Sequence, residues 1–141
     1  MTVKTLRIAA ALLTRADGKT LLVRKRGTEA FMQPGGKIDA GESPLDALAR
    51  ELNEELGLII APEQARFLGE FSAVAANEPG FDVNCQLYGV QVDDPVNPAA
   101  EIEEAIWVDG GNIDQLHLAP LTRDSILPLY RRLANPGVRH H

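Results

Sequence analysis

The feature that most constrains the fold of this chain is the stretch from Gly36 to Leu58, which reads GKIDAGESPLDALARELNEELGL. Ser43 is a favourable helix N-cap because its hydroxyl can accept a hydrogen bond from the first turn, and Pro44 suits the first helical position. Gly57 supplies a stop, since glycine enters the left-handed conformation without steric cost. The spacing therefore predicts a helix over 44–56 that buries one apolar side, formed by Leu45, Leu48, Ala49, Leu52 and Leu56.

Three glutamates, Glu51, Glu54 and Glu55, share another side of this helix at spacing i, i+3 and i+4. Like charges at this spacing repel by a few tenths of a kcal/mol per pair, and the last turn of a helix disfavours each anion by roughly 0.3–1 kcal/mol. Taken alone, such a run is more often a solvated acidic face. However, clustered carboxylates are also the natural ligands of a hard divalent cation, and sites that break local stability rules are often functional.

The spacing of the whole stretch favours the second interpretation. In order, it contains Gly36, Glu42, Arg50-Glu51-Leu52, Glu54-Glu55 and Gly57-Leu58. These residues match every fixed position of the Nudix box, a long and therefore specific motif. The chain thus resembles the Nudix hydrolases, and its PGGKIDAGES string resembles their MutT-like branch most. Both the resemblance and the order of expected elements imply an α/β fold, a mixed β-sheet sandwiched between helices (an α/β/α sandwich).

The resemblance also implies a metal site at the end of the predicted helix. Glu51, Glu54 and Glu55, together with the backbone carbonyl of Gly35, would hold one to three Mg²⁺ or Mn²⁺ ions. The site would then hydrolyse a diphosphate bond.

The remaining catalytic candidates are an arginine and two downstream acids. Arg50 would orient Glu51 or Glu42 by a charge-assisted hydrogen bond. The general base would be Glu51, Glu101 or Glu104. The alternative for the last two is an exposed, charged strand edge that discourages aggregation.

Contacts to substrate are expected just before the box. In the predicted strand over 21–26, the period of two puts Arg24 and Arg26 on one face and Lys25 on the other. Because this strand leads into the loop before the box, Arg26 is the first candidate for a phosphate contact and Arg24 the second. Phe31 could touch a nucleobase, although packing in the core is the alternative.

The rest of the chain predicts further strands and a terminal helix within one domain over residues 1–141. Pro34 to Gly36 is expected to form a tight turn after a short loop over 27–33. Thr122 is expected to cap the terminal helix and Pro128 to kink it. Strands are expected over 6–14, 21–26, 66–76, 82–92 and 101–109, with bulges at the glycine of 66–76 and near Glu104.

Composition narrows the class of protein and its partners. A net charge of −6 argues against a nucleic-acid-binding surface. No apolar run is long enough for a membrane span and no secretory signal is recognisable, so a cytoplasmic location and no membrane partner are expected. Cys85 is the single cysteine and is expected to be a buried, reduced thiol. A homodimer is compatible with the sequence, although no apolar stripe demands one.

These observations predict metal-dependent hydrolysis of a nucleoside diphosphate linked to another moiety. The PGGKIDAGE string favours a MutT-like nucleoside triphosphate pyrophosphohydrolase. An ADP-ribose or dinucleoside polyphosphate pyrophosphatase is the first alternative. A non-catalytic, nucleotide-sensing Nudix domain is the second, although such domains usually lose box glutamates and this chain keeps them all.

Overall fold

The computed structural model describes residues 4–75, 79–109, 111, 113 and 115–134. The expected end of the third strand at Ala76 lies outside these residues. The elements are β1 (Lys4–Thr14), β2 (Thr20–Lys25), β3 (Phe31–Met32), β4 (Gly35–Lys37), α1 (Pro44–Leu56), the short 3-10 turn η1 (Pro62–Gln64), β5 (Ala65–Val74), β6 (Phe81–Gln91), β7 (Ile102–Val108), the π-helical turn η2 (Thr122–Ile126) and α2 (Leu127–Ala134).

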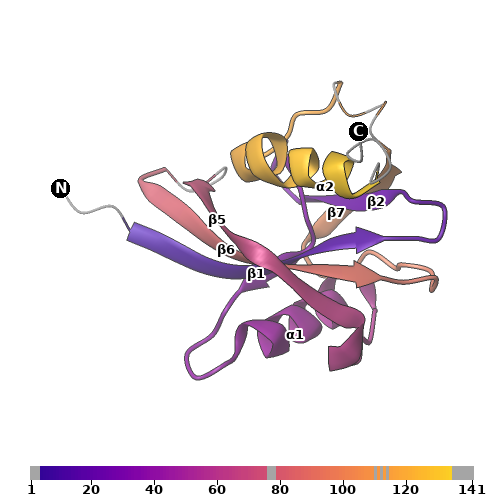
Figure 1. The fold of residues 1–141 in the computed structure, drawn as a ribbon. Helices are drawn as coiled ribbons and strands as arrows, with labels where there is room; N and C mark the ends of the chain where they lie inside the picture. Colours follow the sequence, from indigo (N-terminus) through magenta and orange to yellow (C-terminus); the bar gives the residue numbers. More distant parts are fainter. Residues whose placement is uncertain (1–3, 76–78, 110, 112, 114, 135–141) are drawn as a thin grey trace.

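A mixed sheet forms the middle layer of the molecule, with α1 on one face and α2 on the other (Figure 1). The strand order is β3-β2-β1-β6-β5, with β4 paired to β1 and β7 paired to β2. Strands β1 and β6 run parallel, whereas the other pairs are antiparallel. The predicted α/β/α sandwich is confirmed.

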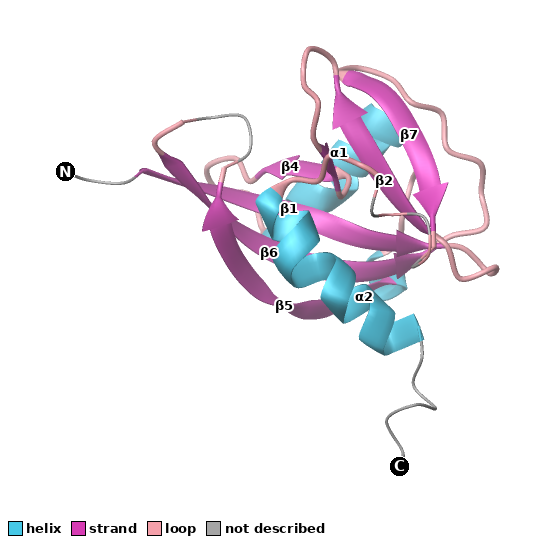
Figure 2. Cartoon of the chain, turned by 90° about the horizontal axis from the view of Figure 1, so that it is seen from above, coloured by secondary structure: helices cyan, strands magenta, loops and turns pink. Residues whose placement is uncertain are grey.

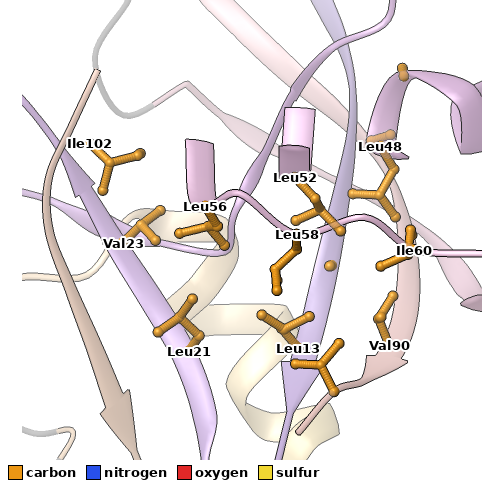
Figure 3. Packing of buried hydrophobic residues seen from close by; sticks show 14 residues of the cluster. Leu13, Leu21, Val23, Leu48, Leu52, Leu56, Leu58, Ile60, Val90 and Ile102 are labelled. Atoms are coloured by element: carbon orange, nitrogen blue, oxygen red, sulfur yellow. The ribbon is translucent and has the colours of Figure 1, made fainter. Parts of the chain in front are cut away.

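Strand β1 separates two hydrophobic cores because its apolar run alternates between the two faces. Ala9, Ala11 and Leu13 belong to the core on the α1 side. Figure 3 shows Leu13 in this core with Leu48, Leu52 and Leu56 of the helix. Ala10 and Leu12 point to the side of η2 and α2. Burial on both faces explains why this strand has no polar residue from position 8 to position 13.

The sheet splits into two wings at the end of β1 (Figure 2). β1 and β2 form the predicted hairpin but pair only at Thr14 and Thr20. Beyond that point this edge of β2 pairs with β3 at Val23 and Arg24, whereas the same edge of β1 pairs with β4 at Ile8 to Ala10. The other edge of β2 pairs with β7. The start of the Nudix box is thereby fixed to the central strand.

Two local predictions before the box were wrong. The segment over 27–33, expected to be a loop, contains β3, and the expected tight turn at Pro34 to Gly36 gives way to strand β4. The absence of a side chain at Gly35 permits close approach of the backbone to a neighbouring strand. Here the neighbouring strand is β1, with which β4 pairs. A local sequence pattern cannot show this pairing, because β1 lies far from these glycines in the chain.

The terminal helix also begins differently from the prediction. Helical backbone starts at Pro120, and the carbonyl of Ala119 accepts the bond from the N–H of Arg123 (2.9 Å). Thr122 therefore lies inside the helix and is not its cap. Close to Pro128, where the sequence predicts a kink, the helix contains the π-helical turn η2, which ends two residues before the proline. Proline lacks an N–H and crowds the carbonyl four residues earlier, which favours such an irregularity.

Both predicted bulges are confirmed. The pairing of β5 with β6 shifts between Phe67 and Gly69, and the pairing of β2 with β7 shifts between Arg24 and Lys25, which leaves Glu103 as the extra residue of β7. Within the described residues, no helix has the length and apolar character needed to span a membrane.

Candidate active site

Helix α1 has the predicted bounds and caps. The Oγ of Ser43 accepts a hydrogen bond from the N–H of Asp46 (3.1 Å), and Gly57 adopts a left-handed φ of 68°. Leu48, Leu52 and Leu56 are fully buried against the sheet. This packing fixes the helix with its acidic side directed toward β4, so the glutamates are held by the fold of the whole domain.

The three box glutamates occupy different environments despite their shared helix side. The Glu55 side chain is buried, and its Oε1 accepts a hydrogen bond from the N–H of Gly35 (3.2 Å). The side chain of Glu51 is mostly covered, whereas that of Glu54 is half exposed. Depth therefore differs along the cluster, from a buried carboxylate at Glu55 to a solvent-facing one at Glu54.

Two glycines allow this close approach. A Cβ on Gly35 would collide with the carbonyl oxygen of Ala9, and the φ of Gly35 is 147°, which L side chains rarely adopt. A Cβ on Gly36 would instead collide with the carboxylate of Glu51. The PGG string thus brings the β4 backbone into contact with β1 on one side and with the glutamates on the other.

Burial dominates the electrostatics of Glu55. Loss of solvent raises the pKa of this carboxyl to about 8, although the Gly35 N–H and the charge of Lys25 act to lower it. The nearby Glu51 raises the pKa further. A buried carboxylate with so little compensation is the kind of group that a cation stabilises.

Arg50 of α1 binds Glu42, which lies in the loop between β4 and α1, the box loop. Its Nε and Nη2 donate to the two oxygens of Glu42 (2.8 and 2.9 Å), and its Nη1 donates to Oε1 of Glu51 (2.8 Å). Nη2 also donates to the carbonyl of Lys37 (3.1 Å). The guanidinium therefore meets both glutamates that the sequence offered as its partners, and bidentate pairing lowers the pKa of Glu42 to about 2.

A pocket of about 520 Å³ joins the carboxylates to a set of cations. Glu51, Glu54, Glu55 and Glu101 line it, together with Lys25, Arg26 and Lys37. Acidic and basic side chains therefore line the same pocket. Cations beside clustered carboxylates suit a ligand that carries several negative charges and arrives with a metal ion.

Other predicted site residues lie elsewhere. Arg24 pairs with Glu104 across β2 and β7 (3.2 Å) and donates to the carbonyl of Thr28 (2.9 Å). Phe31 is buried in the core on the α2 side. Neither Arg24, Glu104 nor Phe31 borders the pocket that the box carboxylates line.

Lys25 lines the pocket although it is not among the predicted substrate contacts, and Arg26 lies with it and not with Arg24. The alternation holds to the end of β2, so Lys25 follows Leu21 and Val23 onto the α1 side, whereas Arg24 lies over Phe31 on the α2 side. Arg26 lies beyond the strand, so the alternation does not apply to it. Lys25 and Arg26 consequently line the same pocket. The period of two already puts Lys25 on the face of Leu21 and Val23, and recognising that face as the α1 side would have found this residue.

The proposed ligand atoms are of the type that binds a hard divalent cation. They are carboxylate oxygens and a backbone carbonyl, which Mg²⁺, Mn²⁺ and Ca²⁺ prefer. Within the described residues, however, no three acidic, histidine or cysteine side chains already converge as a finished metal site. Glu51 is directed to Arg50 and Glu55 to Gly35, so cation binding requires these side chains to exchange partners.

Comparison with known proteins shows the class to which this fold and site belong. The sequence model of the NUDIX domain matches residues 4–130, and the chain therefore belongs to the Nudix family.

Individual relatives agree with this assignment. A protein named 8-oxo-dGTP diphosphatase from Haemophilus influenzae is 40% identical over 60 residues, which is 40% of this chain and 44% of that protein. A protein named RNA pyrophosphohydrolase from Halorhodospira halophila is 41% identical over 58 residues, covering 41% of this chain and 31% of that protein. The chain thus matches less than half of the length of these curated relatives.

A solved structure covers nearly the whole chain. The crystal structure of a putative nudix hydrolase family member from Chromobacterium violaceum is 28% identical, with a TM-score of 0.71 over 96% of this chain and 82% of that one. The likeness in fold therefore extends well beyond the box.

Proposed function

We propose that this chain hydrolyses a diphosphate bond in a nucleoside diphosphate linked to another moiety, with nucleoside triphosphates as the favoured substrates. The observation that carries the proposal is the single pocket in which Glu51, Glu54 and Glu55 face Lys25 and Arg26. The names of the relatives, a diphosphatase and a pyrophosphohydrolase, support the same reaction class.

The acidic part of the pocket would hold the cation. Glu51, Glu54 and Glu55 line the pocket and are the proposed ligands. The carbonyl of Gly35, whose N–H donates to Glu55, is the fourth. When bound, a divalent cation supplies positive charge that offsets the charge of the phosphate oxygens. Arg50 would hold Glu51 and Glu42 in place through its hydrogen bonds to both carboxylates.

The protein's own side chains would bind the phosphates and accept a proton. Lys25 and Arg26 lie where they can donate to phosphate oxygens. Glu51 or Glu101 would take the proton of the attacking water, because both line the pocket. Glu104 pairs with Arg24 outside the pocket, which favours the other two as the base.

Glu54→Gln tests the proposal directly. The change removes a charge from the proposed metal site at a half-exposed position, so we expect kcat to fall by roughly a hundredfold or more while the fold is kept. Release of pyrophosphate, phosphate and nucleoside monophosphate from a panel of nucleotides with Mg²⁺ measures this and identifies the substrate.

The control is Glu63→Gln, which removes an exposed acid from η1, away from the pocket. This variant should match the wild type in rate and in melting temperature. Full activity in Glu54→Gln would refute the assignment of the site, and binding of nucleotides without turnover by the wild type would favour a sensing domain.

The proposal includes three finer statements. The ion is Mg²⁺ or Mn²⁺. Measuring activity after the metal is removed, and again as each ion is added back, tests this. Two chains associate as a homodimer, which a mass twice the 15.3 kDa of one chain would show. The protein works in the cytoplasm, which cell fractionation tests.

A further inference from the structure

One residue in the wall of the pocket has a backbone conformation that alanine rarely adopts. Ala100 has a φ of 55°, and within the part of the chain that the structure describes it is the one non-glycine residue with a positive φ. Residues with a Cβ avoid this left-handed region for steric reasons. Such strain persists only where the surrounding structure imposes it, and it is concentrated at functional sites. Ala100 lines the pocket together with Glu101.

Ala100 and Glu101 are the two central residues of a tight turn. The N–H of Ile102 donates to the carbonyl of Ala99 (3.1 Å), which closes the turn over four residues. A positive φ at the first central residue belongs to the turn types that glycine, asparagine and aspartate usually form. We refer to residues 99–102 as the Ala100 turn.

The Ala100 turn is bound to the last turn of α1. The N–H of Ala99 donates to the carbonyl of Glu55 (2.9 Å), and the N–H of Asn97 donates to the carbonyl of Leu56 (2.9 Å). Carbonyls at the end of a helix have no partner within the helix, so these bonds satisfy them. The turn is thereby attached to the backbone of one of the three box glutamates.

On its other side the turn is bound to the end of β2. The N–H of Arg26 donates to the carbonyl of Glu101 (2.7 Å), next to the pairing of Lys25 with Ile102. Arg26 is one of the two residues proposed to contact phosphate. A single turn therefore connects the acidic side of the pocket with its basic side.

The conformation of Ala100 determines whether both connections can be made together. One connection is made by the N–H of Ala99, before Ala100, and the other by the carbonyl of Glu101, after it. A different φ at Ala100 would rotate Glu101 relative to Ala99. The turn could then keep its bond to α1 or its bond to β2, but not both.

We propose that Ala100 is a positioning residue, whose left-handed conformation lets the turn bind α1 and β2 at once and so places Glu101 and Arg26 in the pocket. The inference rests on the proposed function, because it takes this pocket to be the site of hydrolysis. The rate is then expected to depend on the Glu101 carboxylate, and phosphate binding on the placement of Arg26.

Valine at position 100 tests the conformation, because branching at Cβ makes a positive φ far less accessible than it is to alanine. Ala100→Val should lower kcat/KM by about tenfold or more for the nucleotide that the wild type hydrolyses fastest. Ala100→Gly and Ala100→Asn should restore the rate that valine loses, since both residues accept a positive φ. The matched control is Ala61→Val, because Ala61 has an extended backbone (φ −85°, ψ 150°) that valine adopts.

A double variant separates positioning from general damage to the fold. Glu101→Gln alone should lower kcat by about tenfold or more. If Ala100 acts through Glu101, Ala100→Val should lower kcat little further in the Glu101→Gln protein, whereas independent damage would multiply the two effects. Multiplied effects would overturn the inference, as would an Ala100→Gly variant as slow as Ala100→Val. If Ala100→Val does not fold, Ala100→Leu takes its place.

Binding of inorganic pyrophosphate with Mg²⁺ separates this inference from the proposed function, because calorimetry requires no hydrolysis of a nucleotide. Ala100→Val should weaken this binding about as much as Arg26→Gln does, and Ala100→Gly should restore it. That result supports the inference even if no nucleotide is hydrolysed. Full kcat in Glu101→Gln, or unchanged pyrophosphate binding in Ala100→Val, would each refute the role of Ala100, whereas hydrolysis by the wild type would leave the proposed function intact.

Discussion

At the scale of single residues, Gly35 and Gly36 are neighbours with different requirements. Gly35 faces the backbone of β1 and has a positive φ, whereas Gly36 faces only the flexible end of Glu51. Gly35→Ala should therefore destabilise the protein by about 1–3 kcal/mol from backbone strain, with the collision at Ala9 adding to this. Gly36→Ala should change stability little and lower activity, because it displaces Glu51.

Urea unfolding and initial rates measure these two effects. Gly18→Ala is the matched control for strain, since Gly18 also has a positive φ (87°) but nothing within 4 Å of the position of a Cβ. It should cost less than Gly35→Ala. Equal stability of Gly35→Ala and the wild type would contradict the close contact with β1.

The three box glutamates also show where residue patterns stop being informative. The spacing placed them on one helix side, and the structure agrees. The sequence gives no reason for Glu55 to be buried while Glu54 is half exposed. That difference arises because β4 covers one end of the cluster, which depends on pairing with β1.

At the scale of elements, α1 was predictable to the residue because its signals are local. Ser43, Pro44 and Gly57 act within one turn of the helix ends, and the leucine spacing fixes the buried side. The terminal helix was less predictable. Thr122 resembled a cap in sequence, but its hydroxyl bonds Gln33, which is far away along the chain.

The contact between the box loop and α1 should depend on pH. The pKa of Glu42 is lowered from its ordinary 4.5 to about 2, first by the Arg50 guanidinium and then by the N–H of Asp39. Because the folded-state pKa is depressed, the stabilising contribution of this carboxylate is fully present above pH 4.5 and is lost as the pH falls through about 2. We expect the wild type to be more stable than Glu42→Gln at pH 7 and the difference to vanish near pH 2.

Urea midpoints of the two proteins between pH 7 and pH 2 measure this difference. The same series with Glu63→Gln corrects for general acid destabilisation, since Glu63 lies away from the box. A stability difference between wild type and Glu42→Gln that stays constant down to pH 2 would show that the contact between Arg50 and Glu42 does not act through the Glu42 charge.

At the scale of the whole molecule, cation binding should be coupled to stability. Ligands that bind only the folded state stabilise it, by about 2.7 kcal/mol at a concentration 100 times Kd. We expect Mg²⁺ to raise the melting temperature of the wild type. Glu55→Gln replaces a buried carboxylate by a neutral amide of the same size, so the metal-free variant should be at least as stable and should lose the response to Mg²⁺.

Thermal unfolding with EDTA and with increasing Mg²⁺ tests both parts. Glu63→Gln should respond as the wild type does, because its carboxylate lies away from the pocket. A Glu55→Gln variant that keeps the full Mg²⁺ shift would exclude Glu55 as a ligand. A loss of stability without metal would instead show that its contact with Gly35 requires the carboxylate.

The sequence alone determined the Nudix box, the helix 44–56 with its caps and the carboxylate set, because each depends on spacing within a few turns of chain. The layered α/β architecture followed from the order of the elements and from the resemblance that the box carries. Only the tertiary structure decided which cations and polar groups join the site. Arg26 joins Lys25 at the pocket because it lies beyond the end of β2, and the hydroxyl of Thr122 from the terminal helix donates to Gln33. Such contacts join segments far apart in the chain, so no local pattern encodes them and the packing of the sheet sets their geometry.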